Sequence, residues 1–433
     1  MKIIRADANE FLDFFQKIRR RGGAFTPDLL ENVAQIIHDI SVRGDEALFH
    51  YTKKFDGYDI TATTVEATAS ERKDAAAKVN PQDRNVIKLA ADRIEKYHRH
   101  QITSGYSIGD ENGVALGQRI LPLHRVGIYA PGGKAFYPST LIMAAIPARI
   151  AGVKEIILVS PVKDGQLNPL IAAAADVAGV DRIFKIGGAQ AIAALAYGTQ
   201  TVPRVDKIVG PGNAYVAAAK KLVFGQVAID MIAGPSEVVV IADQTANPAF
   251  AAADMLAQAE HDEMSAAILF TPYPDLAQEV AREVQRQLQT LPKKIIIEKS
   301  LSQYGAIIIT SDIAQAVELT NLFAPEHLEL MVENPADLVE KIHSAGSVFL
   351  GSYTPEALGD YLAGANHILP TEGTARFSSP LGVYDFYKRM SVLSFSQTAF
   401  EKLSGPTQHF AQMEGLDAHA NSVRVRSIKD KDK

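Results

Sequence analysis

The sequence predicts an α/β fold with two domains built on mainly parallel sheets, a helical N-terminal segment and a small C-terminal arm. Three observations lead to this prediction. Short apolar segments alternate with helical segments from about residue 126 to 223. The same alternation resumes from about residue 238 to 323. Glycine clusters stand where predicted strands lead into helices. This rhythm is typical of a parallel sheet covered by helices.

The elements follow from the spacing of apolar residues. The first hundred residues are predicted to be helical, with apolar residues at helical spacing in 28–40, 46–54 and 81–100. Strands are predicted at 114–121, 126–129, 155–160, 182–186, 207–209, 238–242, 266–271 and 306–309. Helices are predicted between them at 139–151, 169–178, 190–197, 213–223, 248–261, 275–288 and 313–323.

We divide the chain into four parts. The N-terminal helical segment is 1–25, and the first α/β domain combines 26–125 with 236–380. The second α/β domain is 126–235, and the arm is 381–433. After about residue 380 the pattern weakens to polar sequence with scattered aromatic residues, ending in a strand-like segment at 422–426. Such a segment is expected to pack on something else.

The composition excludes several classes of protein and site. The 433 residues have a net charge of −6 and include no cysteine, so the chain has no disulfide, thiolate nucleophile, cysteine-rich zinc finger or iron–sulfur cluster. No basic cluster indicates a nucleic-acid partner. The most apolar stretch, 141–153, is interrupted by Pro147 and Arg149 and is too short to span a membrane. The first residues lack the apolar core of a secretory signal, so we expect a cytoplasmic protein.

Glu326 and His327 are the strongest candidates for catalytic residues. A carboxylate beside an imidazole supplies two proton acceptors of different basicity, so one loop could serve two deprotonations. Pro325 disfavours helix at the residue before it, so the preceding helix is predicted to end near Phe323, and a strand is predicted at 328–333. Both side chains would then lie on a turn, where catalytic groups are often held. The alternative is a surface pair without function.

The absence of cysteine also restricts the chemistry that this pair could perform. An aldehyde could not be oxidised through a thioester to the protein, because no thiol is available. Such an oxidation would need a hydrated aldehyde and a base that activates water. Glu326 is suited to that task.

Three glycine clusters are candidates for phosphate binding. They lie at 130–134, 187–190 and 210–213, each between a predicted strand and a predicted helix. Free amides and the dipole at a helix N-terminus favour anions there. A tight turn is the alternative for each cluster. None completes G-x-G-x-x-G, because Tyr215 stands where the third glycine would be. The clusters are therefore compatible with a nucleotide but lack its standard fingerprint.

Gln258 and His261 are candidate metal ligands. With Asp254 they stand at i, i+4 and i+7, so a helix places them on one face. Asp254 could orient His261 but is left outside the predicted site. An exposed polar helix face is the alternative. The segments 359–367 and 414–419 add carboxylates and histidines. A site of two histidines, an aspartate and an amide oxygen suits zinc, although manganese or cobalt could occupy a similar site.

Taken together, these motifs resemble those of the histidinol dehydrogenase family over essentially the whole chain. The motifs that carry the resemblance occur in the family's order, at 126–133, 210–213, 233–237, 258–262, 324–329 and 364–370. The resemblance implies two Rossmann-like domains that do not use the Rossmann fingerprint. It also implies oxidation of L-histidinol through histidinal to L-histidine, the last step of histidine biosynthesis, with two NAD molecules as successive hydride acceptors.

The resemblance assigns roles to individual residues. It implies one zinc ion per subunit and a homodimer with shared active sites, with zinc ligands at Gln258, His261, Asp360 and His419, the last from the partner subunit through an exchanged arm. The other residues expected to contact substrate are Ser236, His327, Tyr361, His367 and Glu414. NAD is expected to contact Tyr129, Gln190 and Asn213. His327 would act as the base of both oxidations, and Glu326 would activate water.

Two other classes of function remain open. A zinc hydrolase could use Glu326 as its general base and the same ligands, with purely structural glycine turns. A non-catalytic NAD-binding protein would keep the glycine turns, but it has no need of Glu326 and His327. A family member acting on another amino alcohol is a further alternative, because a matched pocket does not fix the substrate.

Overall fold

The computed structural model describes residues 1–19, 21, 25–110, 113–132 and 136–427. Gly133 and Lys134 of the first glycine cluster lie outside the described residues. The chain divides into two compact units. The first unit comprises Met1–Gln101 and Leu123–Phe386, and the second comprises Ile102–Pro122 and Tyr387–Lys433. None of the helices in the described ranges is long and apolar enough to cross a membrane.

The first unit contains a parallel six-stranded sheet with the order β1-β11-β10-β9-β12-β13. Its strands are β1 (Lys2–Arg5), β9 (Glu237–Ala242), β10 (Ala266–Thr271), β11 (Gly305–Ile309), β12 (His327–Met331) and β13 (Ser347–Leu350). All residues of β9, β10 and β12 are buried. Such fully buried strands are expected where helices cover both faces of a sheet.

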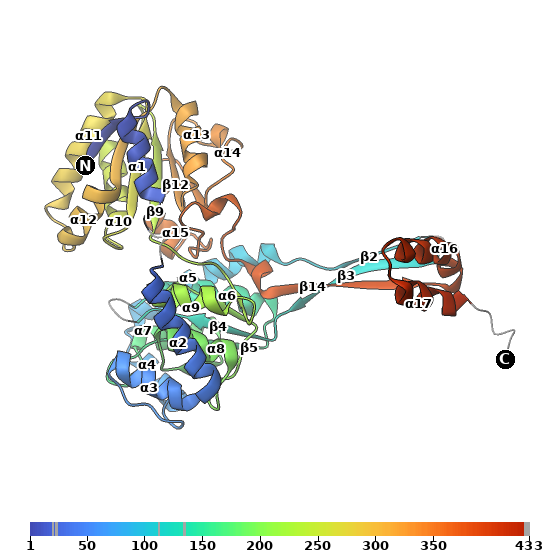
Figure 1. The fold of residues 1–433 in the computed structure, drawn as a ribbon. Coiled ribbons are helices and arrows are strands. Elements are labelled where there is room, and N and C mark those ends of the chain that lie inside the picture. Colours follow the sequence, from blue (N-terminus) through green and yellow to red (C-terminus); the bar gives the residue numbers. More distant parts are fainter. Residues whose placement is uncertain (20, 22–24, 111–112, 133–135, 428–433) are drawn as a thin grey trace, which may run out of the picture. The chain divides into compact units, whose positions relative to one another are not determined.

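Two groups of helices cover this sheet (Figure 1). On one face, α10 (Pro248–Ala259), α11 (Pro274–Leu288) and α12 (Lys294–Tyr304) share a core with Val238 and Val240. On the other face, α1 (Asn9–Arg19) and α13 (Ile313–Phe323) share a core with Val239 and Ile241. Successive residues of β9 thus point to opposite faces, as the pleat requires. The helix α14 (Ala336–Val339) lies between β12 and β13 in the chain.

A second parallel sheet in the same unit has the order β6-β5-β4-β7-β8. Its strands are β4 (Arg125–Tyr129), β5 (Glu155–Val159), β6 (Arg182–Phe184), β7 (Lys207–Val209) and β8 (Ala228–Ile229). The helices that alternate with these strands are α6 (Pro138–Ala151), α7 (Pro169–Ala178), α8 (Gly188–Tyr197) and α9 (Ala214–Val223). The predicted α/β class with mainly parallel sheets is therefore confirmed.

The predicted grouping of the N-terminal residues is wrong. Residues 2–5 form β1, which pairs with β11, and α1 shares a core with the same sheet, so both elements are part of the six-stranded layer and not a separate helical segment. Helices α2 (Pro27–Arg43) and α3 (Asp45–Asp56) share a core with the five-stranded sheet. They were expected to pack with residues 236–380. Periodicity identifies the apolar face of a helix, but it does not identify the sheet that will cover that face.

Two further helices belong to the five-stranded layer. α4 (Ala69–Ala77) contacts α7, and α5 (Pro81–His98) contacts α6 and α7. The start of α5 is marked in the sequence, because the Asn80 side chain accepts a hydrogen bond from Asp83 N and Pro81 is the first helical residue. Residues 27–98 therefore belong with the five-stranded sheet.

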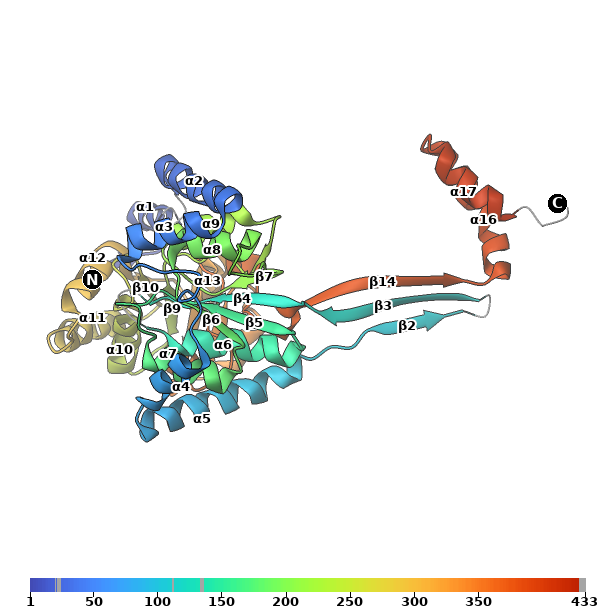
Figure 2. The same cartoon turned by 90° about the horizontal axis from the view of Figure 1, so that it is seen from below.

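The second unit is an antiparallel three-stranded sheet with two helices. Its strands are β2 (Tyr106–Gly109), β3 (Val114–Pro122) and β14 (Tyr387–Phe395), with β3 in the middle. Figure 2 shows the three strands side by side, with α16 (Gln397–Met413) following β14 and α17 (Asp417–Ser427) following α16. The arm therefore includes residues 102–122, which were expected in the first domain.

The expected strand at 422–426 is wrong, because these residues belong to α17. Apolar and polar residues alternate over this short stretch, which matches the period of a strand. The helix begins five residues earlier at Asp417, and a five-residue alternation is too short to distinguish the two structures.

Candidate active site

The local fold places Glu326 and His327 at the start of β12. α13 ends at Phe323, as predicted, because Ala324 takes the left-handed conformation (φ 52°) and donates from its N–H to Thr320 O. His327 is the first residue of β12, in register with Val238 of β9. His327 is thus a strand residue and not a turn residue as predicted. Both side chains of the pair are buried, which excludes the surface-pair interpretation.

Glu326 is held by a reciprocal pair of hydrogen bonds with Glu237, the first residue of β9. Glu326 Oε2 accepts from Glu237 N at 2.9 Å, and Glu326 N donates to Glu237 Oε2 at 3.3 Å. On its other side, Glu237 Oε1 accepts from Arg21 Nη2 at 2.9 Å. Burial raises the pKa of Glu326 well above its ordinary value, and the charges of Glu237 and Asp360 raise it further. Glu326 is therefore a fixed carboxylate with increased basicity.

His327 has one of its ring nitrogens committed to the backbone. Nδ1 lies 3.1 Å from Glu237 O, and a carbonyl can only accept, so we assign the proton to Nδ1 and the free lone pair to Nε2. Burial lowers the pKa of His327 to about 4, and the nearby His261 and His367 oppose protonation. A neutral imidazole with a free Nε2 is the form that a general base requires.

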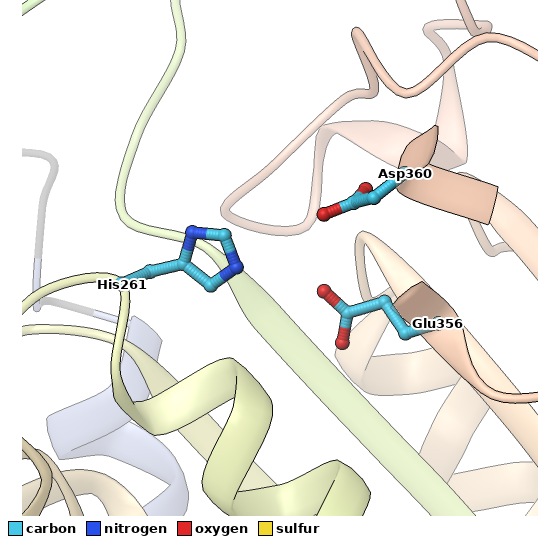
Figure 3. A group of neighbouring side chains, drawn as sticks. All are labelled: His261, Glu356 and Asp360. Carbon is cyan, nitrogen blue, oxygen red and sulfur yellow. The ribbon is translucent and has the colours of Figure 1, made fainter. Parts of the chain in front are cut away.

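Three further side chains converge beside His327. The side chains of His261, Glu356 and Asp360 offer a nitrogen and carboxylate oxygens that all lie within 4.8 Å of one another (Figure 3). Gln258, which is fully buried, lies at the end of α10, one turn before His261. Imidazole nitrogen, carboxylate oxygen and amide oxygen fit zinc or a similar divalent ion. The structure thus brings three of the four predicted ligand residues to one place.

Glu356 was missed in the sequence. It is the first residue of α15 (Glu356–Tyr361), and it stands four residues before Asp360. The i, i+4 spacing places both carboxylates on one face of that short helix. This spacing was the available signal, but without the fold nothing connected it to Gln258 and His261.

The fourth predicted ligand, His419, lies in the second unit. His419 is exposed on α17, and Glu414 is exposed at the C-terminal cap of α16. Neither belongs to the cluster of His261, Glu356 and Asp360, all of which lie in the first unit. Their predicted roles remain predictions.

A cavity of about 680 Å³ joins these residues to the five-stranded sheet. The residues that the six-stranded side contributes include Ser236, His261, Glu326, His327, Glu356, Asp360, Tyr361 and His367. The other side contributes Pro131, Gly212 and Asn213, which follow β4 and β7. The cavity therefore lies at the amino ends of β9 and β12 and at the carboxyl ends of β4 and β7. Because ligands of open parallel sheets bind at the carboxyl ends of the strands, the five-stranded sheet presents its usual ligand-binding edge to the cavity.

His367 has partners for both ring nitrogens. Nδ1 lies 2.9 Å from Asp360 O, and Nε2 lies 3.1 Å from Thr140 Oγ1 on α6. Burial lowers the pKa of His367. His367 therefore connects the six-stranded side of the cavity to α6 of the five-stranded layer.

The three residues expected to contact NAD are not gathered at this cavity. Asn213 lines it and caps α9, with its Oδ1 accepting from Tyr215 N and Val216 N at 3.1 Å each. Tyr129 and Gln190 are buried, and neither is among the lining residues. Tyr129 Oη accepts from Gly188 N at 3.2 Å. The second and third glycine clusters lead directly into α8 and α9, and the third also borders the cavity.

Asp254 does not orient His261. It interacts instead with Glu329 of β12, and burial raises the pKa of Asp254 to about 6. Glu329 Oε1 accepts from Glu356 N at 2.8 Å. Asp254 therefore supports the start of α15 through Glu329, and not the predicted ligand His261.

Comparison with known proteins was consistent across sequence and structure. A family profile described as histidinol dehydrogenase matches residues 19–427. The chain is 52% identical over 430 residues to histidinol dehydrogenase of Syntrophotalea carbinolica, covering 99% of this chain and 100% of the relative. It is 49% identical over 412 residues to that of Lactococcus lactis, covering 95% and 96%. A crystal structure of histidinol dehydrogenase from Elizabethkingia anophelis matches with a TM-score of 0.91 and 40% identity, covering 98% and 97%.

Proposed function

Because the chain belongs to the histidinol dehydrogenase family, we propose that it oxidises L-histidinol through histidinal to L-histidine in the cytoplasm, using two NAD molecules in succession. The observation that carries this proposal is the buried pair Glu326 and His327 on the wall of a cavity that also holds a cluster of metal-ligand side chains. The pair supplies the bases that two successive oxidations require.

The donor atoms beside His327 fit the metal ion that this reaction needs. Gln258, His261 and Asp360 would hold zinc, with His419 of the partner subunit as the fourth ligand. Zinc, when bound, orients the imidazole and amine of the substrate. NAD, when bound, accepts the hydride. Tyr129, Gln190 and Asn213 are the residues proposed to contact it.

His327 performs the first proton transfer of the proposed reaction. Its free Nε2 accepts the hydroxyl proton as the carbinol carbon loses its hydride, which leaves histidinal. The hydrogen bond at Nδ1 keeps the ring in the tautomer that can accept this proton. Ser236, Tyr361, His367 and Glu414 of the partner subunit are proposed to line the substrate pocket.

Glu326 performs the step that separates the two oxidations. Its carboxylate takes a proton from water as the water oxygen bonds to the aldehyde carbon, and the carbonyl oxygen takes the proton that His327 gained in the first oxidation, which gives a gem-diol and a neutral His327. His327 then accepts a diol proton as the second hydride leaves for NAD, and the carboxylic acid formed loses its remaining proton to solvent to give the carboxylate. No thioester is involved, because the sequence has no cysteine.

The second unit supports a homodimer. Its sheet and helices expose many large apolar side chains, among them Ile108, Leu393, Phe395, Phe410 and Met413. Apolar patches of this kind mark interaction surfaces. We propose that a second copy of the chain covers this unit and that the exchanged arm delivers Glu414 and His419 to the partner's site.

The proposal is tested by identifying the product. The purified protein is incubated with L-histidinol, excess NAD and zinc, and the products are separated by chromatography. We expect L-histidine without accumulation of histidinal. Histidinal as the final product would contradict the role of Glu326. Absence of any oxidation would favour another amino alcohol or a zinc hydrolase.

A further inference from the structure

Glu356 is a buried carboxylate that has no step in the proposed reaction. Its side chain is 4% exposed, and its backbone N–H donates to Glu329 Oε1 at 2.8 Å, which fixes the start of α15. A buried carboxylate is costly unless it receives hydrogen bonds. Its Oε1 lies 3.7 Å from His327 Nδ1, which is too far for a hydrogen bond.

The fully buried Gln258 supplies the missing partner. One edge of its amide faces Glu356 Oε2 at 3.0 Å, Glu356 Oε1 at 3.2 Å and Glu237 O at 3.2 Å. The nitrogen and oxygen of an amide are assigned from such contacts. Glu237 O can only accept, so the atom at this edge is Nε2, whether or not Glu356 carries a proton.

His327 is compatible with this arrangement. Gln258 Nε2 also lies 3.3 Å from His327 Nδ1, but both atoms carry hydrogen in the tautomer assigned above, so this contact is not a hydrogen bond. The two hydrogens of the amide go to Glu356 and to Glu237 O. The carbonyl of Glu237 has two lone pairs and accepts from both side chains.

We propose that Glu356 is a positioning residue for the metal centre: it binds the NH2 group of Gln258 and leaves the amide oxygen as the atom available to an ion held by His261 and Asp360. An amide NH2 group cannot ligate a cation, because its nitrogen lone pair is delocalised into the carbonyl and its two hydrogens can only donate. The orientation of this amide therefore decides whether Gln258 is a ligand. The inference rests on the proposed function only in taking Gln258 as a ligand.

The test is a double-mutant cycle read by zinc affinity. Zinc dissociation constants are measured by competition with a chromophoric chelator for the wild type, Glu356→Ala, Gln258→Ala and the double variant. We expect each single variant to bind zinc about 10- to 100-fold more weakly. We expect the double variant to bind no more weakly than Gln258→Ala, because Glu356 acts through that amide. Independent, multiplying losses would mean that Glu356 is itself a ligand and would overturn the proposal.

Two control variants distinguish the loss of positioning from misfolding and from a general effect of charge. Glu356→Gln keeps an acceptor oxygen for Gln258, so it should retain more zinc affinity than Glu356→Ala. This variant also serves as the test if Glu356→Ala does not fold. Glu260→Gln removes a charge beside His261. Because the Glu260 backbone N–H bonds to the backbone carbonyl of Gln258, the substitution leaves the Gln258 side-chain amide unchanged, and this variant should bind zinc as the wild type does. Zinc affinity that is unchanged in Glu356→Ala, or absent in the wild type, would overturn the inference. Zinc binding without histidine formation would overturn only the proposed function.

Discussion

Glu326 and His327 differ in basicity because burial acts on them in opposite directions. It raises the pKa of the Glu326 carboxyl well above its ordinary value and lowers the pKa of the His327 imidazole to about 4. Glu326→Gln should therefore slow histidinal oxidation about 10²- to 10⁴-fold and slow histidinol oxidation less. His327→Asn should slow both oxidations. Hydride transfer is measured separately with each substrate, and equal losses in the glutamine variant would contradict the division of roles.

Arg21 supports Glu326 indirectly, through Glu237. Its guanidinium is buried against Glu237 Oε1, and burial raises the pKa of Glu237 to about 7 although Arg21 opposes this rise. Arg21→Met would leave the Glu237 carboxylate buried without its cation. We expect the free energy of unfolding to fall by about 3–5 kcal/mol, measured in urea.

The control for Arg21 is an ion pair at the surface. Arg286→Met removes an arginine that pairs with Glu283 on the exposed side of α11. Such pairs contribute little, so the stability of this variant should change little. Equal effects of the two substitutions would show that the buried pair has no special role.

At the level of elements, the start of the short helix α15 depends on two acidic residues, Asp254 and Glu329. Asp254 of α10 interacts with Glu329 of β12, and Glu329 Oε2 has no other hydrogen-bond partner among the described residues. Glu329 Oε1 receives the first N–H of α15. Burial raises the pKa of each carboxyl, and a proton shared by the two would satisfy both.

This pair should make stability depend on pH. The pKa of Asp254 is about 6 in the folded chain against an ordinary value of 3.8, so the folded state binds more protons between these values. The stabilisation is present below the ordinary pKa and is lost as pH rises through about 6, by at most ~3 kcal/mol. Asp254→Asn should remove this part of the loss. Unfolding free energies of both proteins at pH 4.5 and 7.5 test it, and parallel declines would contradict it.

The elements themselves were largely predictable, and their partners were not. The apolar run of β9 and the helical spacing of α10 and α13 identify these elements within a few residues. The packing of α2 on the five-stranded sheet was not predictable, because one apolar face fits either layer. The pairing of residues 114–122 with 387–395 is equally non-local.

The same limit applied to the candidate site. Glu326 and His327 are adjacent in the chain and Gln258 and His261 share a helical spacing, so local patterns identified them. Glu356 joins them only because α15 packs beside α10 in the fold. The burial that raises the pKa values of these acidic side chains also depends on the tertiary structure.

For the whole molecule, the exposed apolar arm predicts assembly. Phe410 is 62% exposed on α16, and a charge at that position should weaken any apolar interface there. We expect Phe410→Glu to shift the protein from dimer to monomer in analytical ultracentrifugation and to reduce histidine formation. Gln412→Glu adds the same charge about 200° around the helix and should stay dimeric. A monomeric wild type would contradict the dimer proposal.

The stoichiometry of NADH tests the central claim most directly. NADH formed per L-histidinol consumed is counted at completion, in samples with zinc, after chelation and after zinc is restored. The proposed function predicts two NADH per histidinol, lost on chelation and recovered with zinc. One NADH per histidinol would mean that oxidation stops at the aldehyde, which would contradict the role assigned to Glu326.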